Sequence, residues 1–221
     1  MVGTLTLPMY YSVLSPGPLN PPGVHRTGKL RILFVYPNSR RESIVPPAIT
    51  LLSRIAKNLG FATEVFDSTG YEISQHGYSD KVREQNLTVR PSAHVGIALG
   101  DTEQMHADLR RKVFEFQPDL IAVTSTEVTF GLAITILQGI VDLKIPVLLG
   151  GVFATFAPDR ALEFPEINMV CVGEGELLFA QLCTRMSQGQ DVGQLPGLWL
   201  KTASGEVIKN GKAPLPDLDQ N

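Results

Sequence analysis

The chain has 221 residues, a formal net charge of -3 and two cysteines. This charge gives no electrostatic reason to expect nucleic acid or an anionic membrane surface as a partner. Two cysteines are too few for a disulfide framework, so we expect a reducing, cytoplasmic location. The N-terminus lacks the basic region of a signal peptide, and no apolar run approaches the ~20 residues that span a bilayer. Membrane insertion is therefore not expected.

Residues 1–28 are rich in proline and glycine, which predicts an irregular surface arm. A change of pattern follows at residues 30–36, LRILFVY, a nearly continuous apolar run typical of a strand buried on both faces. Pro46 and Pro47 favour the start of a helix, and Gly60 suits the position just past its end.

The strand–helix unit then recurs along the chain. Further strands are predicted at 62–66, 119–124, 145–149 and 167–172, and further helices at 105–116, 131–143 and 177–186. Such alternation predicts an α/β fold, a Rossmann-like (flavodoxin-like), doubly wound, parallel five-stranded sheet over residues 29–196. Strand orders 2-1-3-4-5 and 3-2-1-4-5 both fit. Residues 68–104 are a long insertion, and residues 197–221 predict a β-hairpin turning at Ser204-Gly205, then a linker.

Special residues follow four of these strands. Ligands of open parallel sheets bind at the carboxyl ends of the strands, so we expect the site there. Its candidate residues are Pro37, Asn38, Ser125, Thr126, Gly150, Gly151, Val152, Phe153, Thr155, Gly173, Glu174, Gly175 and Glu176. Glycines allow close approach of a ligand, and the hydroxyls and amides suit neutral hydrogen-bonding groups. Few cationic side chains lie there, and neither a Walker A motif nor GxGxxG follows the first strand, which argues against a polyphosphate site.

Four segments carry a family resemblance: PDLIAVTS, IPVLLGGVFATFAPDRAL, VCVGEGE and PLPDLD. Over residues 29–219 the chain resembles the N-terminal cobalamin-binding domain of cobalamin-dependent radical S-adenosylmethionine enzymes. The resemblance favours strand order 2-1-3-4-5 and implies cobalamin as cofactor. It adds Thr124 to the loops that surround the corrin edge and the nucleotide tail. It also implies that a [4Fe-4S] cluster and S-adenosylmethionine belong to a catalytic domain that follows the linker, where this chain stops as an excised domain would.

Two absences refine this expectation. The segment PNSRRES after the first strand lacks the histidine of the DxHxxG motif, and Phe153 stands where related domains often carry a histidine. We therefore expect cobalamin to be held base-off without a histidine ligand. Cys171 and Cys183 cannot form the CxxxCxxC motif of a radical enzyme, so we interpret them as core thiols and expect no turnover from this chain alone.

The parent protein is then expected to be a methyltransferase or an enzyme that modifies tetrapyrroles or lipids. Two alternatives stay open: a flavodoxin-like module for a flavin or nucleotide, and a vestigial interaction domain without cofactor. Glu174 and Glu176 either contact the ligand or only favour the helix dipole. The four histidines, at positions 25, 76, 94 and 106, are expected to be solvated or locally bonded, with no metal site, and residues 68–104 are expected to be mobile.

Overall fold

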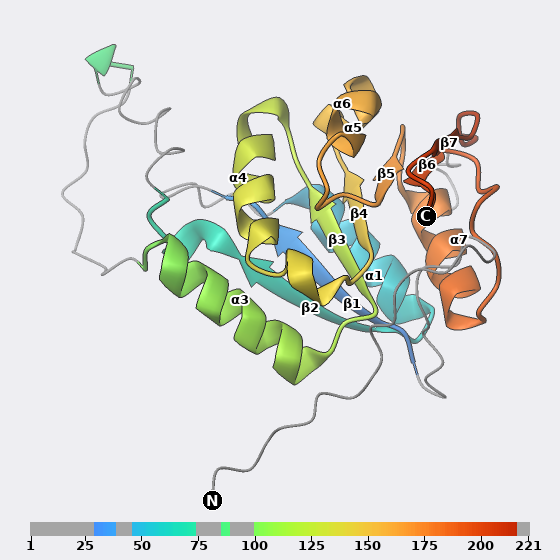
Figure 1. Cartoon of the computed structure of the whole chain (residues 1–221), viewed down its shortest axis with the longest axis horizontal. Coiled ribbons are helices and arrows are strands. Elements are labelled where there is room, and N and C mark those ends of the chain that lie inside the picture. The colour runs from blue at the N-terminus through green and yellow to red at the C-terminus, as the bar shows by residue number, and fades with distance from the viewer. Residues whose placement is uncertain (1–28, 39–45, 74–84, 89–99, 216–221) are drawn as a thin grey trace, which may run out of the picture.

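The computed structural model describes residues 29–38, 46–73, 85–88 and 100–215 and contains one seven-stranded sheet (Figure 1). Its strands are β1 (Arg31–Tyr36), β2 (Ala62–Asp67), β3 (Leu120–Thr124), β4 (Val147–Gly150), β5 (Met169–Cys171), β6 (Leu198–Lys201) and β7 (Val207–Lys209). The order is β2-β1-β3-β4-β5-β6-β7, and the first five strands are parallel. This confirms the predicted order 2-1-3-4-5.

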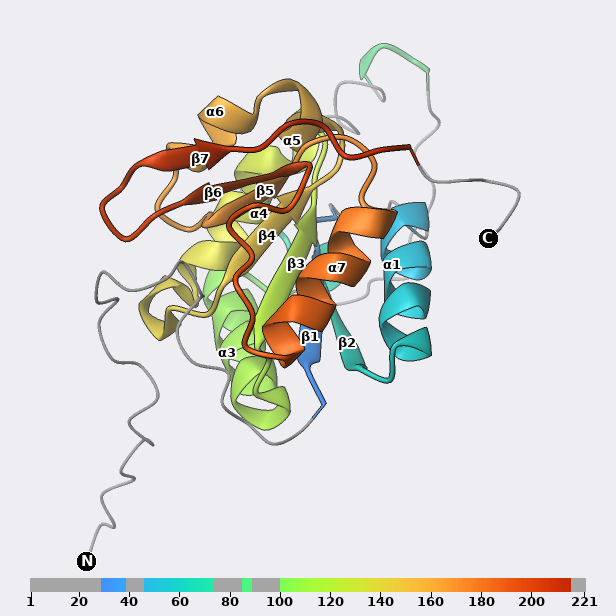
Figure 2. The ribbon, with the colours of Figure 1, turned by 90° about the vertical axis from the view of Figure 1, so that its right-hand side faces the viewer.

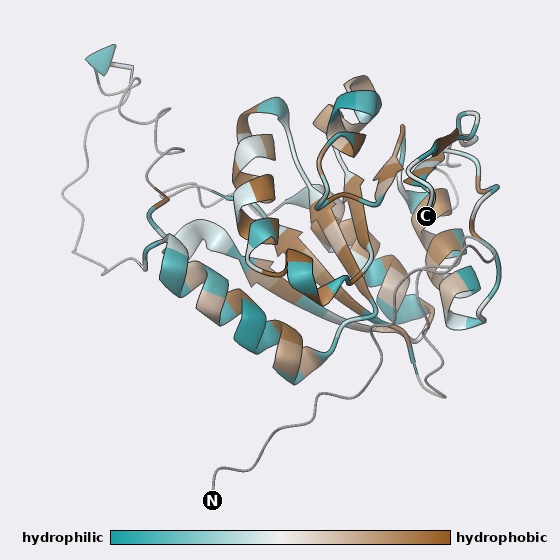
Figure 3. Ribbon diagram, in the orientation of Figure 1, coloured by the Kyte–Doolittle hydropathy of each residue, from teal (hydrophilic) through white to brown (hydrophobic). Residues whose placement is uncertain are grey.

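Helices cover both faces of the sheet. They are α1 (Pro47–Asn58), α3 (Thr102–Phe116), α4 (Glu127–Gln138), α5 (Val152–Phe156), α6 (Pro158–Leu162) and α7 (Glu176–Ser187). One hydrophobic cluster joins the sheet to α3, α4, α5 and α6, and a second joins it to α1 and α7, which lie side by side (Figure 2). The central strands β1, β3, β4 and β5 are accordingly apolar on both faces (Figure 3). None of the helices in the described part is long and apolar enough to cross a membrane.

Local sequence explains where the helices begin and end. Pro47 is the first residue of α1, and Gly60 has a φ of +83° just past its end, as predicted. Helix α4 begins at Glu127 rather than at the predicted Gly131, because the Thr126 N–H donates to Thr129 Oγ1 (3.0 Å) and caps the helix. It ends at Gln138, and a separate 3₁₀ turn (Val141–Leu143) occupies the rest of the predicted helix.

The two ends of the predicted insertion pair with each other. After β2 comes a 3₁₀ turn (Ser68–Gly70), and Tyr71 then pairs with Gly100. The Glu72 N–H donates to Gly100 O (2.7 Å) and the Gly100 N–H to Gly70 O (3.1 Å). The described residues on either side of the insertion therefore lie side by side before α3. Residues 74–84 and 89–99, like the predicted arm at 1–28, lie outside the described residues, so the predicted mobility stays a prediction.

The C-terminal hairpin extends the same sheet, since β6 pairs antiparallel with β5 and β7 antiparallel with β6. Its turn lies at Ser204-Gly205 as predicted, where Gly205 has a φ of +86° and its N–H donates to Thr202 O (3.0 Å). After β7 the chain returns toward β5: the Gly197 N–H donates to Gly211 O (2.6 Å) and the Val172 N–H to Gly197 O (2.8 Å). Residues 210–213 therefore lie near the carboxyl end of β5.

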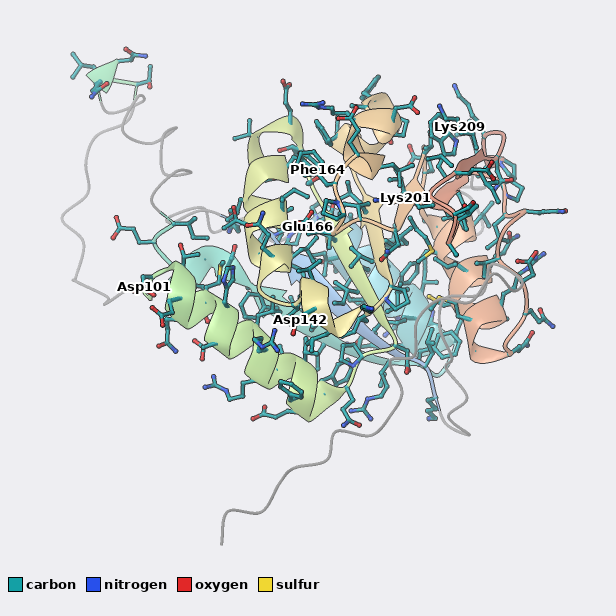
Figure 4. The ribbon with its side chains drawn as sticks, in the orientation of Figure 1. Asp101, Asp142, Phe164, Glu166, Lys201 and Lys209 are labelled. Carbon is teal, nitrogen blue, oxygen red and sulfur yellow. The ribbon has the colours of Figure 1, made fainter. Side chains whose placement is uncertain are left out.

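Lys201 anchors the middle of the hairpin to the loop between α6 and β5. Its Nζ donates to the backbone oxygen of Phe164 (2.6 Å), in the region that also holds Glu166 (Figure 4). Burial lowers the pKa of Lys201, and the charge of Glu166 acts in the opposite direction. Lys209 on β7 also forms an ion pair with Asp159 of α6. These contacts fix the antiparallel edge of the sheet against α6.

Candidate ligand-binding site

A cavity of about 160 Å³ opens at the carboxyl ends of β1, β3, β4 and β5, between the sheet, α1 and α7. Most of its wall is apolar. The lining residues are Phe34, Ala48, Ile49, Leu51, Leu52, Ala122, Val123, Thr124, Leu148, Gly150, Gly151, Cys171, Gly173, Glu174, Gly175, Glu176 and Phe179. The cavity lies at the edge where ligands of open parallel sheets bind, next to the reversal of strand order between β1 and β3.

Half of the predicted residues line this cavity. They are Thr124, Gly150, Gly151, Gly173, Glu174, Gly175 and Glu176. They come from the end of β3, the turn after β4 and the turn after β5, which meet because parallel strands end at one edge of the sheet. The structure therefore brings together three of the four loops that the sequence singled out.

Gly151 sits where a side chain does not fit. Its φ is +96°, and a Cβ atom built on it would lie 2.6 Å from Ser125 O and 2.9 Å from Thr124 Oγ1. The turn is pressed against the end of β3, because the Ser125 N–H donates to Gly150 O (3.1 Å) and the Phe153 N–H donates to Ser125 O (3.3 Å). Only glycine meets both requirements, and the Gly150-Gly151 turn that results lines the cavity.

Thr155 connects the two glycine-rich turns. Its Oγ1 donates to Gly151 O (3.2 Å) and accepts from the Gly173 N–H (3.2 Å). One hydroxyl thereby holds the turn after β4 against the turn after β5. Thr155 does not line the cavity itself, so the structure shows it supporting the two turns, and its contact with the ligand stays a prediction.

Asn38, predicted to face the ligand, points toward β2 instead. Its Nδ2 donates to Thr69 Oγ1 (2.8 Å), and the Ser68 hydroxyl donates to Asn38 O (2.8 Å). Asn38 is buried, and it does not line the cavity. The remaining predicted residues outside the cavity wall are Pro37, Ser125, Thr126, Val152 and Phe153.

Phe153 belongs to the core on the opposite face of the sheet. Its ring stacks on Phe130 with 4.0 Å between centroids, and Phe130 meets Phe164 edge-on. The position that often holds a histidine in related domains is thus filled by an aromatic packing contact. Ser125 follows the cavity-lining Thr124 and so faces this same side of the sheet, where its Oγ is buried without a partner.

Charge at the cavity comes from carboxylates. Glu176 opens α7, and its Oε2 is buried without a hydrogen-bond partner. Burial, aided by the charges of Glu176 and Glu174, raises the pKa of the Cys171 thiol to about 12. Among the described residues no lysine, arginine or histidine lines the cavity. This chemistry suits an uncharged or weakly basic ligand group and not a polyphosphate.

Much of the apolar wall, which includes Phe34, Leu52 and Phe179, was not predicted from the sequence. Both predicted core thiols are buried and free, as expected, but Cys171 also lines the cavity. His106 lies between α3 and α4, with Nε2 2.7 Å from Thr135 O. In the described ranges no group of three or more histidine, cysteine or acidic residues is arranged to hold a metal ion.

A family model described as the B12 binding domain matches residues 43–183. An uncharacterized methyltransferase of Pyrococcus horikoshii is 30% identical over 131 residues, which cover 58% of this chain and 28% of that protein. The anaerobic magnesium-protoporphyrin IX monomethyl ester cyclase of Rubrivivax gelatinosus is 26% identical over 204 residues, covering 86% of this chain and 31% of that protein. The chain thus spans less than a third of these curated relatives.

Solved structures share the fold. The radical S-adenosylmethionine methyltransferase TsrM from Kitasatospora setae, with cobalamin and a [4Fe-4S] cluster bound, superposes with a TM-score of 0.61 at 25% identity, over 86% of this chain and 30% of that one. The cobalamin-dependent S-adenosylmethionine radical enzyme OxsB, with aqua-cobalamin bound, superposes with a TM-score of 0.53 at 16% identity, over 85% of this chain and 23% of that one.

Proposed function

The chain belongs to the B12-binding domain family, and from this premise we propose that it binds cobalamin base-off, with the displaced dimethylbenzimidazole tail in the cavity between α1 and α7. The observation that carries the proposal is the cavity itself. An apolar cavity of roughly 150 Å³ accepts a benzene-sized ligand, and this one measures about 160 Å³. It holds a group of about the size of benzene, so the bicyclic dimethylbenzimidazole would fill it and extend to its opening, and a corrin ring would rest outside on the rim.

The rim offers an apolar platform for such a ring. Val128, Val152 and Leu177 lie in the first turns of α4, α5 and α7, which all begin at the carboxyl edge of the sheet. Their side chains are 77%, 58% and 39% exposed, respectively. Exposed apolar groups at the same edge of the sheet as the cavity suit a binding surface. The glycine-rich turns between them leave backbone groups open to the amides of the corrin periphery.

When bound, cobalamin supplies a cobalt centre that can accept and pass on a methyl group or an electron. The chain's own residues hold the cofactor: the wall of the cavity excludes water from the tail, and the Gly150-Gly151 turn permits close approach. We propose that no histidine binds cobalt. His106 is engaged with Thr135 on the far face, and the other three histidines and most of PNSRRES lie outside the described residues.

Titration with methylcobalamin and electron paramagnetic resonance of bound cob(II)alamin test this proposal. We expect saturable binding and cobalt lines without splitting by an axial nitrogen. Splitting would show that the base or a histidine occupies the lower position, and absence of binding would return the flavin module and the vestigial domain to consideration. A parallel titration with flavin mononucleotide separates those two.

We further propose that the parent protein is a radical S-adenosylmethionine enzyme that transfers methyl groups or modifies a tetrapyrrole or lipid. The relatives named above support this proposal, since one is a methyltransferase and one a tetrapyrrole cyclase. The cluster and S-adenosylmethionine would belong to a catalytic partner domain, because two buried cysteines cannot supply three cluster ligands. Anaerobic reconstitution of this chain alone should yield no 5′-deoxyadenosine above background, and product formation would refute the assignment.

A further inference from the structure

The two glycine-rich turns of the cavity are held in different ways. The turn after β4 is tightly packed, since a Cβ atom on Gly151 would lie 2.6 Å from the backbone oxygen of Ser125. The turn after β5 begins at Gly173, whose φ is +97°, and a Cβ atom built there would meet no heavy atom within 4 Å. Packing therefore fixes the first turn, whereas the second, with open space beside Gly173, depends on its hydrogen bonds.

The Thr155 hydroxyl ties the second turn to the first. Its single hydrogen is donated to Gly151 O (3.2 Å), four residues earlier, which leaves its lone pairs free to accept. One lone pair accepts the Gly173 N–H (3.2 Å), a contact between residues 18 apart in the chain. The Cys171 thiol also lies 3.9 Å from Gly173 O, but a thiol is a weak donor. The hydroxyl is thus the stronger of these two tethers on Gly173.

Helix α5 fixes the direction of this hydroxyl. A threonine in a helix has two accessible χ1 rotamers, and a bond from Oγ1 to the carbonyl four residues earlier favours one of them. The Thr155 N–H donates to the same Gly151 O (3.1 Å), so backbone and side chain share one acceptor. Because the Gly151 turn is packed against the end of β3, Thr155 holds Gly173 at a set distance from the sheet.

The tether positions one wall of the cavity. Gly173, Glu174 and Gly175 line the cavity. Helix α7 begins directly after them, at Glu176, and adds Phe179 to the wall. The turn is therefore the link between β5 and the helix that, together with α1, encloses the space proposed for the tail. A turn that drifts from the sheet moves the start of α7 and changes the shape of the cavity.

Resting on the proposed binding mode, we infer that Thr155 is a positioning residue that keeps the cavity in the shape that receives the corrinoid tail. It does so through the two turns that it joins. Without the hydroxyl only a fraction of the molecules hold the turn where the tail fits, and the apparent Kd rises by the reciprocal of that fraction. The net contribution of one hydrogen bond limits this rise to about two- to tenfold. A corrinoid without a tail does not enter the cavity, so Thr155 also favours complete corrinoids over tail-less ones.

Thr155→Val and Thr155→Ser test this inference in the full chain. Valine keeps the shape of threonine and removes the hydroxyl, whereas serine keeps the hydroxyl and its bond to the carbonyl four residues earlier. Titration with methylcobalamin and with cobinamide, which lacks the tail, measures both Kd values for each variant. We expect Thr155→Val to raise the Kd of methylcobalamin about two- to tenfold and that of cobinamide less. Thr155→Ser should match the parent.

Thr135→Val is a matched control. Thr135 lies on α4, its hydroxyl makes the same kind of bond to Gly131 O (3.1 Å), and it does not line the cavity. Its variant should keep both Kd values of the parent. Hydrogen exchange of the Gly173 amide, followed by nuclear magnetic resonance without ligand, reports the tether itself. It should be faster in Thr155→Val than in the parent or in Thr155→Ser.

The outcomes separate the inference from the proposed function. A Thr155→Val protein that binds methylcobalamin less than about twofold more weakly than the parent overturns the inference, while the proposed function stands. An equal loss of affinity for cobinamide also overturns it, because the effect then lies outside the cavity. The same holds if Thr155→Ser loses as much affinity as Thr155→Val. If the parent binds cobalamin base-on or not at all, as judged by the cob(II)alamin spectrum, both fail together.

Discussion

Gly151→Ala tests how strongly the folded state requires glycine in the turn after β4. Two costs act at this position. A residue with a Cβ at a φ of +96° is strained by about 1–3 kcal/mol, and a Cβ placed 2.6 Å from the backbone oxygen of Ser125 forces an overpacking shift worth about 1–3 kcal/mol. Together the free energy of unfolding should fall by about 2–6 kcal/mol.

The measurements are urea unfolding without ligand, which gives the free energy of unfolding, and thermal unfolding, in which Tm should fall by roughly 4–24 °C, both followed by far-ultraviolet circular dichroism. Two other glycines serve as controls. Gly173→Ala meets the strain alone, since its φ is +97° but no heavy atom lies within 4 Å of the added Cβ, so only about 1–3 kcal/mol should be lost. Gly150→Ala has Val123 O as its nearest atom at 3.9 Å and no positive φ, and should change stability by less than about 0.5 kcal/mol. A Gly151→Ala protein as stable as Gly150→Ala would refute the reasoning.

Two further predictions concern the core. Burial raises the pKa of Cys171 to about 12 and also raises that of Cys183, so both thiols should react with iodoacetamide far more slowly in the folded than in the unfolded chain at pH 8. Above pH 9, the ordinary thiol value, the unfolded chain loses protons that the folded chain keeps, so the free energy of unfolding should fall as pH rises. Cobalamin should slow labelling of Cys171, which lines the cavity, more than that of Cys183, and equal slowing would contradict the placement of the tail. Gly139→Ala puts a Cβ 2.6 Å from the ring of His106 and should cost about 1–3 kcal/mol, because the ring must move away from Thr135 O. In a His106→Ala background this cost should shrink by about 1 kcal/mol or more, and strict additivity would show that the contact is not the cause.

The fold could be predicted because its signals are local. Apolar runs marked four of the five parallel strands, β1, β3, β4 and β5, and Pro47, Gly60 and Gly205 marked both ends of α1 and the hairpin turn. The start of α4 was missed although Thr126 is a favoured N-cap residue, because Thr129 stands where a capping box usually has Glu or Gln. Helices α5 and α6 were missed because each has five residues, too few to show helical periodicity.

The site could be predicted only to the level of its loops. Neighbouring residues at a strand end point to opposite faces, so Thr124 reaches the cavity while Ser125 does not. Asn38 turned away because Thr69, far along the chain, accepts its amide hydrogen bond. The apolar wall looks in sequence like ordinary core, since a side chain such as Phe179 packs on the sheet and lines a cavity at once.

The return of the chain along β7 has a practical use. The hairpin carries its own turn, Ser204-Gly205, to the amino edge of the sheet, and residues 210–213 come back to the edge with the cavity. The domain thus offers two attachment points, one remote from any bound chromophore and one beside it. A fluorophore coupled after residue 213 should be quenched by a light-absorbing corrin, whereas the same dye at the hairpin turn should be quenched much less. The ratio of the fluorescence intensities at the two attachment points would report ligand occupancy independently of protein concentration.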